Sequence, residues 1–338
     1  MKNLIPITLA TTLVASGISS AQTPAYSKPS GYVTELFKAG QFNLFGITLQ
    51  TPSITGGILT TIGASSVADT SKDFTALLVP GKTYVLEIDD ATSSATGAIA
   101  EVTSWSGSSL NTSPTNLTLL GATNGTKYSL REASTIAQIF GASNEFGLSP
   151  GTLATADILW VSNGSGSFSR YYFATAQPPF VTAGWKLIGG GNVDRSATPL
   201  VYTDGLILQR RGTTDLSLVV TGQVKTTPTV IAVSGNAFNH IGTTFPVGST
   251  LASSGLQATV QAGGLNTSDI VWVPDGTSGY KRYYLATAQP PFVTAGWKLI
   301  GGGNTDRGTE AIRSGIILQR KGPSTNLKIV PPASYSTL

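Results

Sequence analysis

The sequence predicts an all-β protein made of antiparallel β-sandwich or small-barrel modules, in two homologous copies with an inserted β segment in the first. Three observations lead to this fold class. Short segments alternate apolar and polar residues, which is the period of a half-buried strand. Clusters of Gly, Asn, Asp and Ser separate these segments and favour hairpin turns. A long internal repeat indicates a duplicated unit, and helix signals are so few that at most one short helix is expected.

The internal repeat is nearly exact over one stretch. Residues 170–195 and 282–307 match at 24 of 26 positions, at a separation of 112 residues. The match continues upstream, where residues 157–161 (DILWV) correspond to 269–273 (DIVWV), and downstream in a G-[LI]-I-L-Q-R-[RK]-G segment. Two copies of one module explain this pattern best.

A weaker repeat near the N-terminus suggests the domain boundaries. Residues 42–46 (FNLFG) resemble 238–242 (FNHIG), but the first copy lies much farther from its module than the second. We therefore expect four regions. They are a signal peptide at 1–21, an N-terminal β region at 22–134 that holds the start of module 1 plus an insert at about 68–134, the main part of module 1 at 135–228, and module 2 at 229–338. An independent β-domain at 32–134 is the alternative.

The first residues have the features of a secretory signal peptide. Lys2 precedes a short apolar segment, and small residues follow up to Ala21, after which we expect cleavage. The apolar segment is far shorter than the roughly 20 residues of a membrane-spanning helix, and no later segment reaches that length. The sequence thus predicts an exported protein without a transmembrane segment, located in the periplasm, at the cell surface or outside the cell.

Within the insert, the residues around 83–88 and 116–120 have the composition of strands. The expected short helix covers residues 130–140, with Ser129 as its N-cap and Glu132 at the third helical position. In the repeats, the segment 184–189 alternates, so that Trp185 would share one face with Leu187. Lys186 would then lie on the other face.

Composition argues against an enzyme. Only 11% of the residues are charged, none is Cys and one is His, which excludes disulfide frameworks, thiol catalysis and His-rich metal sites. His240 has Leu44 as its repeat equivalent, and the carboxylates of Glu87, Asp89 and Asp90 come at the end of a predicted strand. The G-G-G-N segments lack the features of a phosphate-binding loop. We expect neither a catalytic residue nor a cofactor.

Asp194 and Asp306 are the residues that could support a bound Ca²⁺ as a cofactor. Each precedes an Arg in a Gly-rich stretch, and Ca²⁺ bound to the carboxylate and nearby carbonyls would be the functional interpretation. The simpler interpretation is an Asp that anchors its own loop, beside an Arg in a surface ion pair. No metal ligand is therefore assigned.

A duplicated set of aromatic and cationic residues is the candidate binding site. Exported β-modules bind sugars through exposed aromatic rings, whereas buried rings on alternating strands belong to the core. The sequence leaves both interpretations open. The candidate residues are Tyr172, Trp185, Lys186, Arg195, Tyr284, Trp297, Lys298 and Arg307.

The chain resembles an uncharacterised family of exported bacterial all-β repeat proteins. The resemblance rests on the signal peptide, the F-N-x-x-G segment, the D-I-x-W-V strand, the R-Y-Y hairpin, G-W-K-L-I-G and the G-[LI]-I-L-Q-R-[RK]-G strand. It covers the mature chain and supports the duplicated all-β fold. No activity is known for that family, so the resemblance supplies no catalytic residues.

Taken together, these features predict a non-enzymatic structural or adhesive protein of the cell surface or extracellular matrix. It would act by binding or self-assembly, because a duplicated surface strengthens binding without new chemistry. Its expected partners are copies of itself or a cell-surface polysaccharide, and not nucleic acid, since the basic residues are interspersed with Asp. A carbohydrate-binding protein with duplicated aromatic sites is the alternative, and a glycan hydrolase is a third hypothesis.

Overall fold

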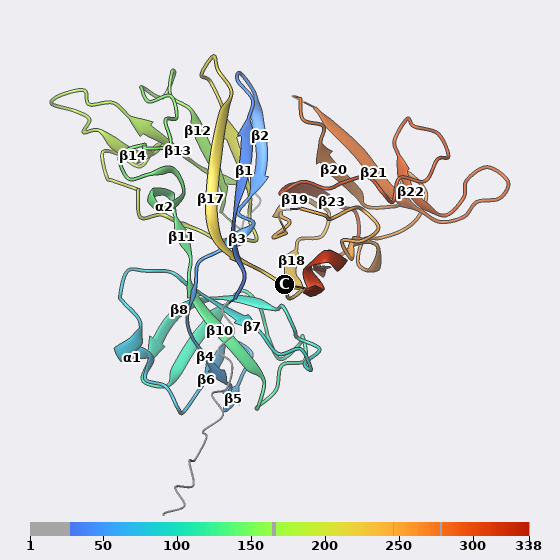
Figure 1. The fold of residues 1–338 in the computed structure, drawn as a ribbon, viewed down its shortest axis with the longest axis horizontal. Helices are drawn as coiled ribbons and strands as arrows, with labels where there is room; N and C mark the ends of the chain where they lie inside the picture. Colours follow the sequence, from blue (N-terminus) through green and yellow to red (C-terminus); the bar gives the residue numbers. More distant parts are fainter. Residues whose placement is uncertain (1–27, 164–166, 246, 278, 338) are drawn as a thin grey trace, which may run out of the picture.

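The computed structural model describes residues 28–163, 167–245, 247–277 and 279–337, so the expected signal peptide at 1–21 lies outside the described residues. The predicted all-β fold is confirmed, with several antiparallel sheets and few helical residues. Figure 1 shows three lobes: one sheet at the bottom of the view, and two smaller ones at the upper left and upper right. No helix among the described residues is long and apolar enough to cross a membrane.

The upper left lobe of Figure 1 contains a five-stranded sheet in the order β14-β13-β12-β16-β2. Its strands are β2 (Phe42–Gly46), β12 (Ile158–Ser162), β13 (Phe168–Ala174), β14 (Gly184–Leu187) and β16 (Gly205–Gln209). A long ribbon in the order β1-β17-β3 packs on this sheet, with β1 at the edge of the ribbon, and a separate two-stranded pair, β11-β15, belongs to the same lobe. These are β1 (Ser30–Phe37), β3 (Leu49–Gln50), β11 (Ser134–Thr135), β15 (Pro199–Leu200) and β17 (Leu216–Val224).

The upper right lobe repeats this arrangement with the same strand order, β19-β23-β20-β21-β22. Its strands are β19 (Ala237–Gly242), β20 (Ile270–Pro274), β21 (Tyr280–Ala286), β22 (Gly296–Leu299) and β23 (Gly315–Arg320). The ribbon is represented by β18 (Thr229–Val233) and β24 (Thr325–Ile329). We call the two lobes module 1 and module 2.

The bottom lobe is a seven-stranded sheet in the order β4-β10-β7-β8-β9-β6-β5, and we call it the insert. Its strands are β4 (Ser53–Ile58), β5 (Thr61–Ile62), β6 (Ser66–Ala68), β7 (Tyr84–Ile88), β8 (Ile99–Ser106), β9 (Ser109–Ser113) and β10 (Lys127–Glu132). The sheet therefore starts near residue 53 rather than near 68. Residues 116–120, expected as a strand, form turns instead.

Each lobe has a hydrophobic core, and the cores show how the chain is connected. The insert has one core around Tyr84 and Leu86, and module 2 has another around Trp297. The core of module 1 around Trp185 also includes Val85 and Ile99 of the insert. Because module 1 shares this core with the insert, the two lobes are held together by buried apolar contacts as well as by the chain.

The expected helix at 130–140 is wrong in its extent. Its first three residues, 130–132, belong to strand β10 (Lys127–Glu132), and the helix α2 (Ile136–Phe140) begins only after the N-cap Thr135. Thr135 forms a capping box with Gln138, so the correct capping signal lay six residues after Ser129. A second short helix, α1 (Phe74–Leu77), was not expected, and two 3₁₀ helices are present, η1 (Leu256–Ala258) and η2 (Ala333–Thr337).

The two modules meet through equivalent strands, so the chain is an internal pseudo-dimer. Gly205 pairs with Gly46 in module 1, as Gly315 pairs with Gly242 in module 2. A Cβ added to Gly205 would lie 2.6 Å from the Ile241 amide nitrogen, and one added to Gly315 would lie 2.9 Å from the carbonyl carbon of the equivalent Phe45. The modules thus contact each other as partners do about a two-fold axis, where only glycine lets the backbones approach.

Candidate functional site

The candidate residues lie at the outer edge of each module, but both tryptophans are buried. Trp185 is 0% exposed and Trp297 is 2% exposed. In the strand register, Trp185 lies opposite Phe173 and Trp297 lies opposite Leu285. Neither ring can stack on a sugar, so the interpretation of the two Trp residues as an aromatic platform is wrong, and both are core residues.

The two lysines, also candidate binding residues, are buried as well. Lys186 donates hydrogen bonds from Nζ to Thr182 Oγ1 and to the Asn192 carbonyl oxygen, both at 3.0 Å. Lys298 makes the same two bonds, to Thr294 and Asn304, at 2.8 and 2.9 Å. Each ammonium group therefore joins two loops from inside. A buried Lys whose donors are satisfied in this way has a structural role.

Tyr172, Tyr284, Arg195 and Arg307 are half-buried. The two Tyr residues lie opposite the buried lysines in the strand register. The Arg backbone amides donate to the carbonyl oxygens of Trp185 and Trp297, at 2.9 and 2.8 Å, which closes the Gly-rich loops onto the sheet. Asp194 anchors its own loop by accepting from Ser196. The candidate set is thus brought together, but mainly as the support of two loops.

Those loops expose a residue that the candidate set does not include. We call residues 175–183 and 287–295 the Phe loops; their nine residues are identical, TAQPPFVTA. Phe180 and Phe292 are each 80% exposed, among the most exposed large apolar side chains of the described chain. In module 1, Phe180 borders a groove of about 310 Å³ together with Tyr172 and Leu187. A Pro-Pro-Phe sequence between two strands was the signal that could have identified it.

Each Phe loop is braced in the same way. Gln177 N donates to the Val181 carbonyl oxygen at 2.8 Å, and Thr182 N donates to Asn192 Oδ1 at 3.0 Å. The copies of both bonds in module 2 have the same lengths. An exposed aromatic ring on a braced loop loses little conformational entropy when it is buried by a partner.

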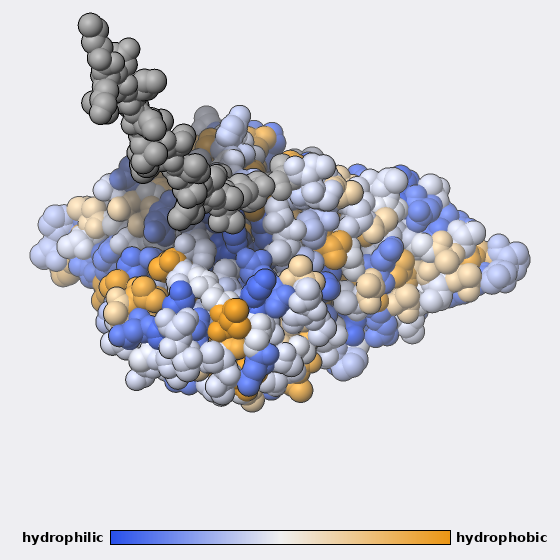
Figure 2. Space-filling model, turned by 60° about the horizontal axis from the view of Figure 1, so that its bottom comes forward, coloured by the Kyte–Doolittle hydropathy of each residue, from blue (hydrophilic) through white to orange (hydrophobic). Residues whose placement is uncertain are grey.

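The loops point away from each other. Figure 1, drawn with the longest axis horizontal, places β14 at the far left and β22 at the far right. Figure 2 shows that on the face seen from below, hydrophobic residues form separate patches among hydrophilic ones. The molecule therefore carries two equivalent apolar loops at opposite ends.

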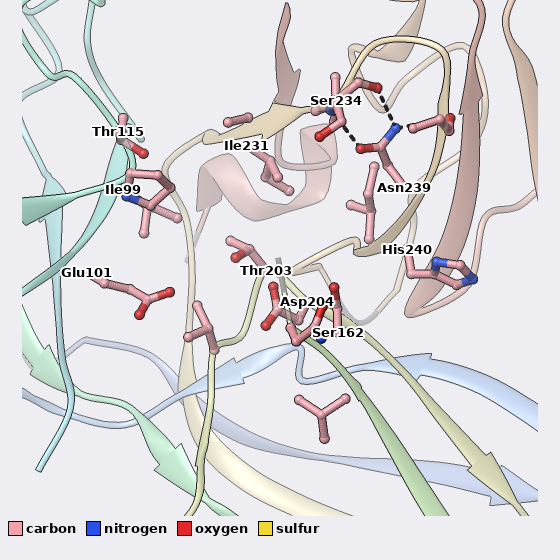
Figure 3. A pocket seen from close by; sticks show the side chains of 18 of the residues that line it. Ile99, Glu101, Thr115, Ser162, Thr203, Asp204, Ile231, Ser234, Asn239 and His240 are labelled. Atoms are coloured by element: carbon pink, nitrogen blue, oxygen red, sulfur yellow. Dashed lines mark hydrogen bonds between the residues drawn. The ribbon is translucent and has the colours of Figure 1, made fainter. Parts of the chain in front are cut away.

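A second candidate site is a cavity of about 670 Å³ where the insert and both modules meet. Its place is fixed by backbone contacts, since Val230 of module 2 donates to the Gly97 carbonyl oxygen of the insert at 2.9 Å. Figure 3 shows the carboxylates of Glu101 and Asp204 pointing toward one another, with His240 at the other side of the cavity. Burial, and then the charge of Glu101, raise the pKa of Asp204 to about 7.

The other titratable groups of this cavity are also shifted by burial. Desolvation raises the pKa of Glu101 and lowers the pKa of His240, whose ring packs edge-on against Phe168 at 4.8 Å. The chain thus places two carboxylates and a His near one cavity, a grouping that sequence reasoning missed. The three residues are far apart in sequence and belong to three different strands or loops, so no spacing could have indicated it.

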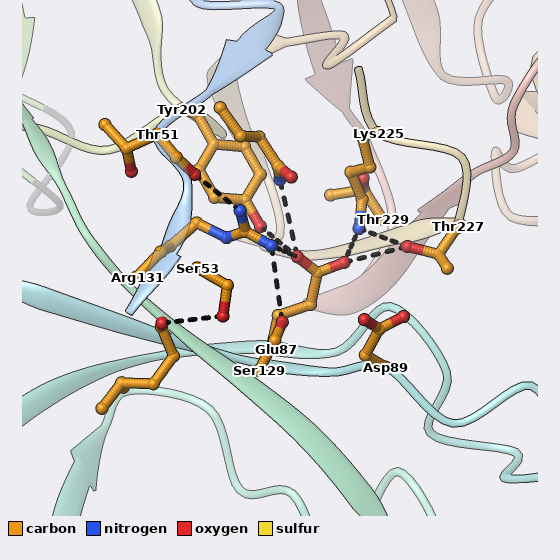
Figure 4. A network of polar contacts seen from close by, with 12 residues as sticks. Thr51, Ser53, Glu87, Asp89, Ser129, Arg131, Tyr202, Lys225, Thr227 and Thr229 are labelled. Atoms are coloured by element: carbon orange, nitrogen blue, oxygen red, sulfur yellow. Dashed lines mark hydrogen bonds and ion pairs between the residues drawn. The ribbon is translucent and has the colours of Figure 1, made fainter. Parts of the chain in front are cut away.

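Figure 4 shows a third polar cluster, which is structural. The carboxylate of Glu87, 2% exposed, contacts Lys225 and lies 3.3 Å from Arg131 Nη2, and it accepts from Thr227 at 3.0 Å. Tyr202 of module 1 lies 3.3 Å from the same carboxylate. These contacts join the insert to module 1 and to the segment that leads to module 2. Every oxygen of Glu87 is engaged, so this carboxylate holds the lobes together.

Among the described residues, no three His, Cys, Asp or Glu side chains gather closely enough to hold a metal ion. Comparisons with protein families, with curated proteins and with solved structures give no match.

Proposed function

We propose that the chain is an exported structural protein of the cell surface or extracellular matrix that assembles end to end through its Phe loops. The observation that supports this most is the duplication itself. The most similar stretch of the two modules contains an exposed Phe on a braced loop, once at each end of the molecule.

The geometry of the duplication favours self-assembly. When two copies meet through the same loop about a two-fold axis, the contact is self-complementary, because both partners present identical surfaces. Each copy then still has the equivalent loop free at its other end. Repetition of this contact gives an open chain of molecules, without any new surface.

The strength expected of each contact is modest. A Phe and its neighbours bury about 150–250 Å² per copy, well below the roughly 800 Å² per partner of a stable interface. A single contact is therefore weak, and assembly is expected only at high local concentration, such as on a surface where many copies are held together.

Multi-angle light scattering of the purified protein over a wide concentration range tests this proposal. The expected mass of the unmodified chain grows with concentration. Phe180→Ser and Phe292→Ser alone would each stop growth at a dimer, and the double variant would stay monomeric. Leu119→Ser is the matched control, because Leu119 is 83% exposed but lies in the insert. A mass that stays monomeric at every concentration, or a double variant that assembles like the unmodified chain, would overturn the proposal.

Carbohydrate binding remains the second candidate, supported by Tyr172 and Tyr284, which keep part of their rings exposed beside the Phe loops. A glycan array with the Phe180→Ser/Phe292→Ser variant separates the two candidates. Glycan binding that this variant loses, with no change of mass in the unmodified chain, would favour the sugar.

A further inference from the structure

We propose that the cavity between the insert and the two modules binds a small organic cation, a protonated amine on an apolar stem, between the carboxylates of Glu101 and Asp204. This inference goes beyond end-to-end assembly, since the cavity contains neither Phe loop.

The charges of the cavity carry the first step. Of the residues described, the ionisable side chains that line it are Glu101, Asp204 and His240. Within the described part of the chain, no ion pair joins either carboxylate to a Lys or Arg. Two neighbouring carboxylates without a cation repel each other, and a bound cation removes that repulsion.

The pseudo-two-fold relation between the modules gives the cavity a counterpart, and the counterpart does not have two unpaired carboxylates. This counterpart is a groove of about 210 Å³. It is bordered by β2 of module 1, whereas the larger cavity is bordered by the equivalent strand β19 of module 2. There Glu35 faces Arg313, and the Ser314 hydroxyl donates to it. The residues at the positions of Arg313 and Ser314 in the larger cavity are Thr203 and Asp204. The smaller groove thus supplies its own Arg, whereas the larger cavity has two carboxylates and His240 but no Lys or Arg in its lining.

The walls determine the class of the cation. Ile99, Val201 and Ile231 line the cavity with Phe168 and Phe238, so the cavity offers apolar and aromatic walls beside its polar groups. An alkyl stem buries apolar area against such walls, and an ammonium group is attracted by aromatic faces as well as by carboxylates. A volume of about 670 Å³ fits a small molecule of this kind. A bare metal ion would lack a third protein carboxylate or His, because no such group of three is found among the described residues.

The expected ligand contact depends on pH in a defined direction. Asp204 binds a cation only when it is ionised, so affinity rises as the pH passes upward through about 7. Glu101 is the other acid facing Asp204, and burial raises its pKa as well. His240 has its pKa lowered by burial, which favours the neutral imidazole that carries no opposing charge.

Isothermal titration calorimetry with pentylamine tests the site, with pentanol as the uncharged match. At about pH 8.5 we expect pentylamine to bind and pentanol to bind about 10-fold more weakly or not at all, a difference of roughly 1.4 kcal/mol. Asp204→Asn and Glu101→Gln are each expected to weaken pentylamine about 10-fold, and lowering the pH to about 5.5 should do the same. Glu35→Gln is the matched control in the equivalent groove and is expected to leave binding unchanged.

Three outcomes would overturn the inference. The first is equal binding of pentanol and pentylamine, which would show an apolar site only. The second is pentylamine binding that Asp204→Asn and Glu101→Gln leave unchanged. The third is calcium chloride displacing pentylamine at lower concentration, which would identify a metal site instead. Light scattering on the same variants distinguishes this result from the assembly proposal, because neither carboxylate lies in a Phe loop.

Discussion

Module 1 and module 2 share their strand order and their outer loops but differ where they meet each other. The hydrogen bonds that Lys186 and Lys298 donate to their outer loops agree in length to within 0.2 Å between the modules. At the contact between modules, by contrast, Leu44 corresponds to His240, and Asp204 corresponds to Ser314. In a symmetric dimer both grooves would be the same by necessity. Joining the two modules in one chain removes this restriction, so one groove has become acidic and the other has a balanced charge.

A buried ion pair is one feature that the modules share. Asp157 contacts Arg210 and Asp269 contacts Arg320, with both Asp side chains 0% exposed. Replacing either Asp by Ala leaves a buried Arg without its partner, at a cost of about 3–5 kcal/mol. We expect the two variants to lose stability equally, as measured by urea unfolding followed by circular dichroism. A loss confined to one module would break the equivalence of the two cores.

The acidic groove predicts a difference between the modules that depends on pH. The pKa of Asp204 is about 7 in the folded chain, above the usual value of an unfolded Asp, so the folded state holds a proton that unfolding releases. The free energy of unfolding should therefore fall by about 3–4 kcal/mol between pH 4 and pH 8 because of this residue alone. Asp204→Asn is expected to remove that fall, and Ser314→Ala, at the equivalent position, to leave it in place. Unfolding curves at several pH values would show this.

The tryptophans predict a smaller difference. Trp185 Nε1 donates to the Gly141 carbonyl oxygen at 2.9 Å, whereas Trp297 Nε1 has no hydrogen-bond partner among the described residues. Trp185→Phe loses that bond and leaves the Gly141 carbonyl with only the longer bond from the Asn144 amide, at 3.4 Å, so we expect it to cost about 1 kcal/mol more than Trp297→Phe. Thermal unfolding of the two single variants measures the difference. Equal costs would mean that the Trp185 bond adds nothing to stability.

The smallest effect on stability is expected at the Phe loops. Phe180→Ser and Phe292→Ser each remove a side chain that is 80% exposed, so each should change the free energy of unfolding by less than about 0.5 kcal/mol. Urea unfolding of dilute protein measures this. A loss above 2 kcal/mol would show that the rings support the fold, and would weaken their use as an assembly surface.

The sequence alone determined the fold class, the repeat and the position of most strands, because alternation and turn composition are local signals. The repeat also located the candidate set, since identical residues at one spacing occupy equivalent places in equivalent sheets. It failed in the first part of the expected helix. Residues 127–132 form backbone ladders with β4 on one side and β7 on the other, and this pairing stabilises a strand instead of a helix.

Only the tertiary structure decided which side chains of the repeat reach solvent. Lys186 is buried because the Phe loop and the Gly-rich loop close over its ammonium group, and Phe180 stays outside. Trp185 is buried because its ring packs in the module core against Phe140 and Phe173. It also brought Glu101 of the insert to Asp204 of module 1, 103 residues later in the chain. Burial and long-range proximity depend on how sheets pack, whereas a sequence pattern reports only on neighbours along a strand. The duplicated strands could therefore be predicted from the sequence, whereas the acidic cavity could not.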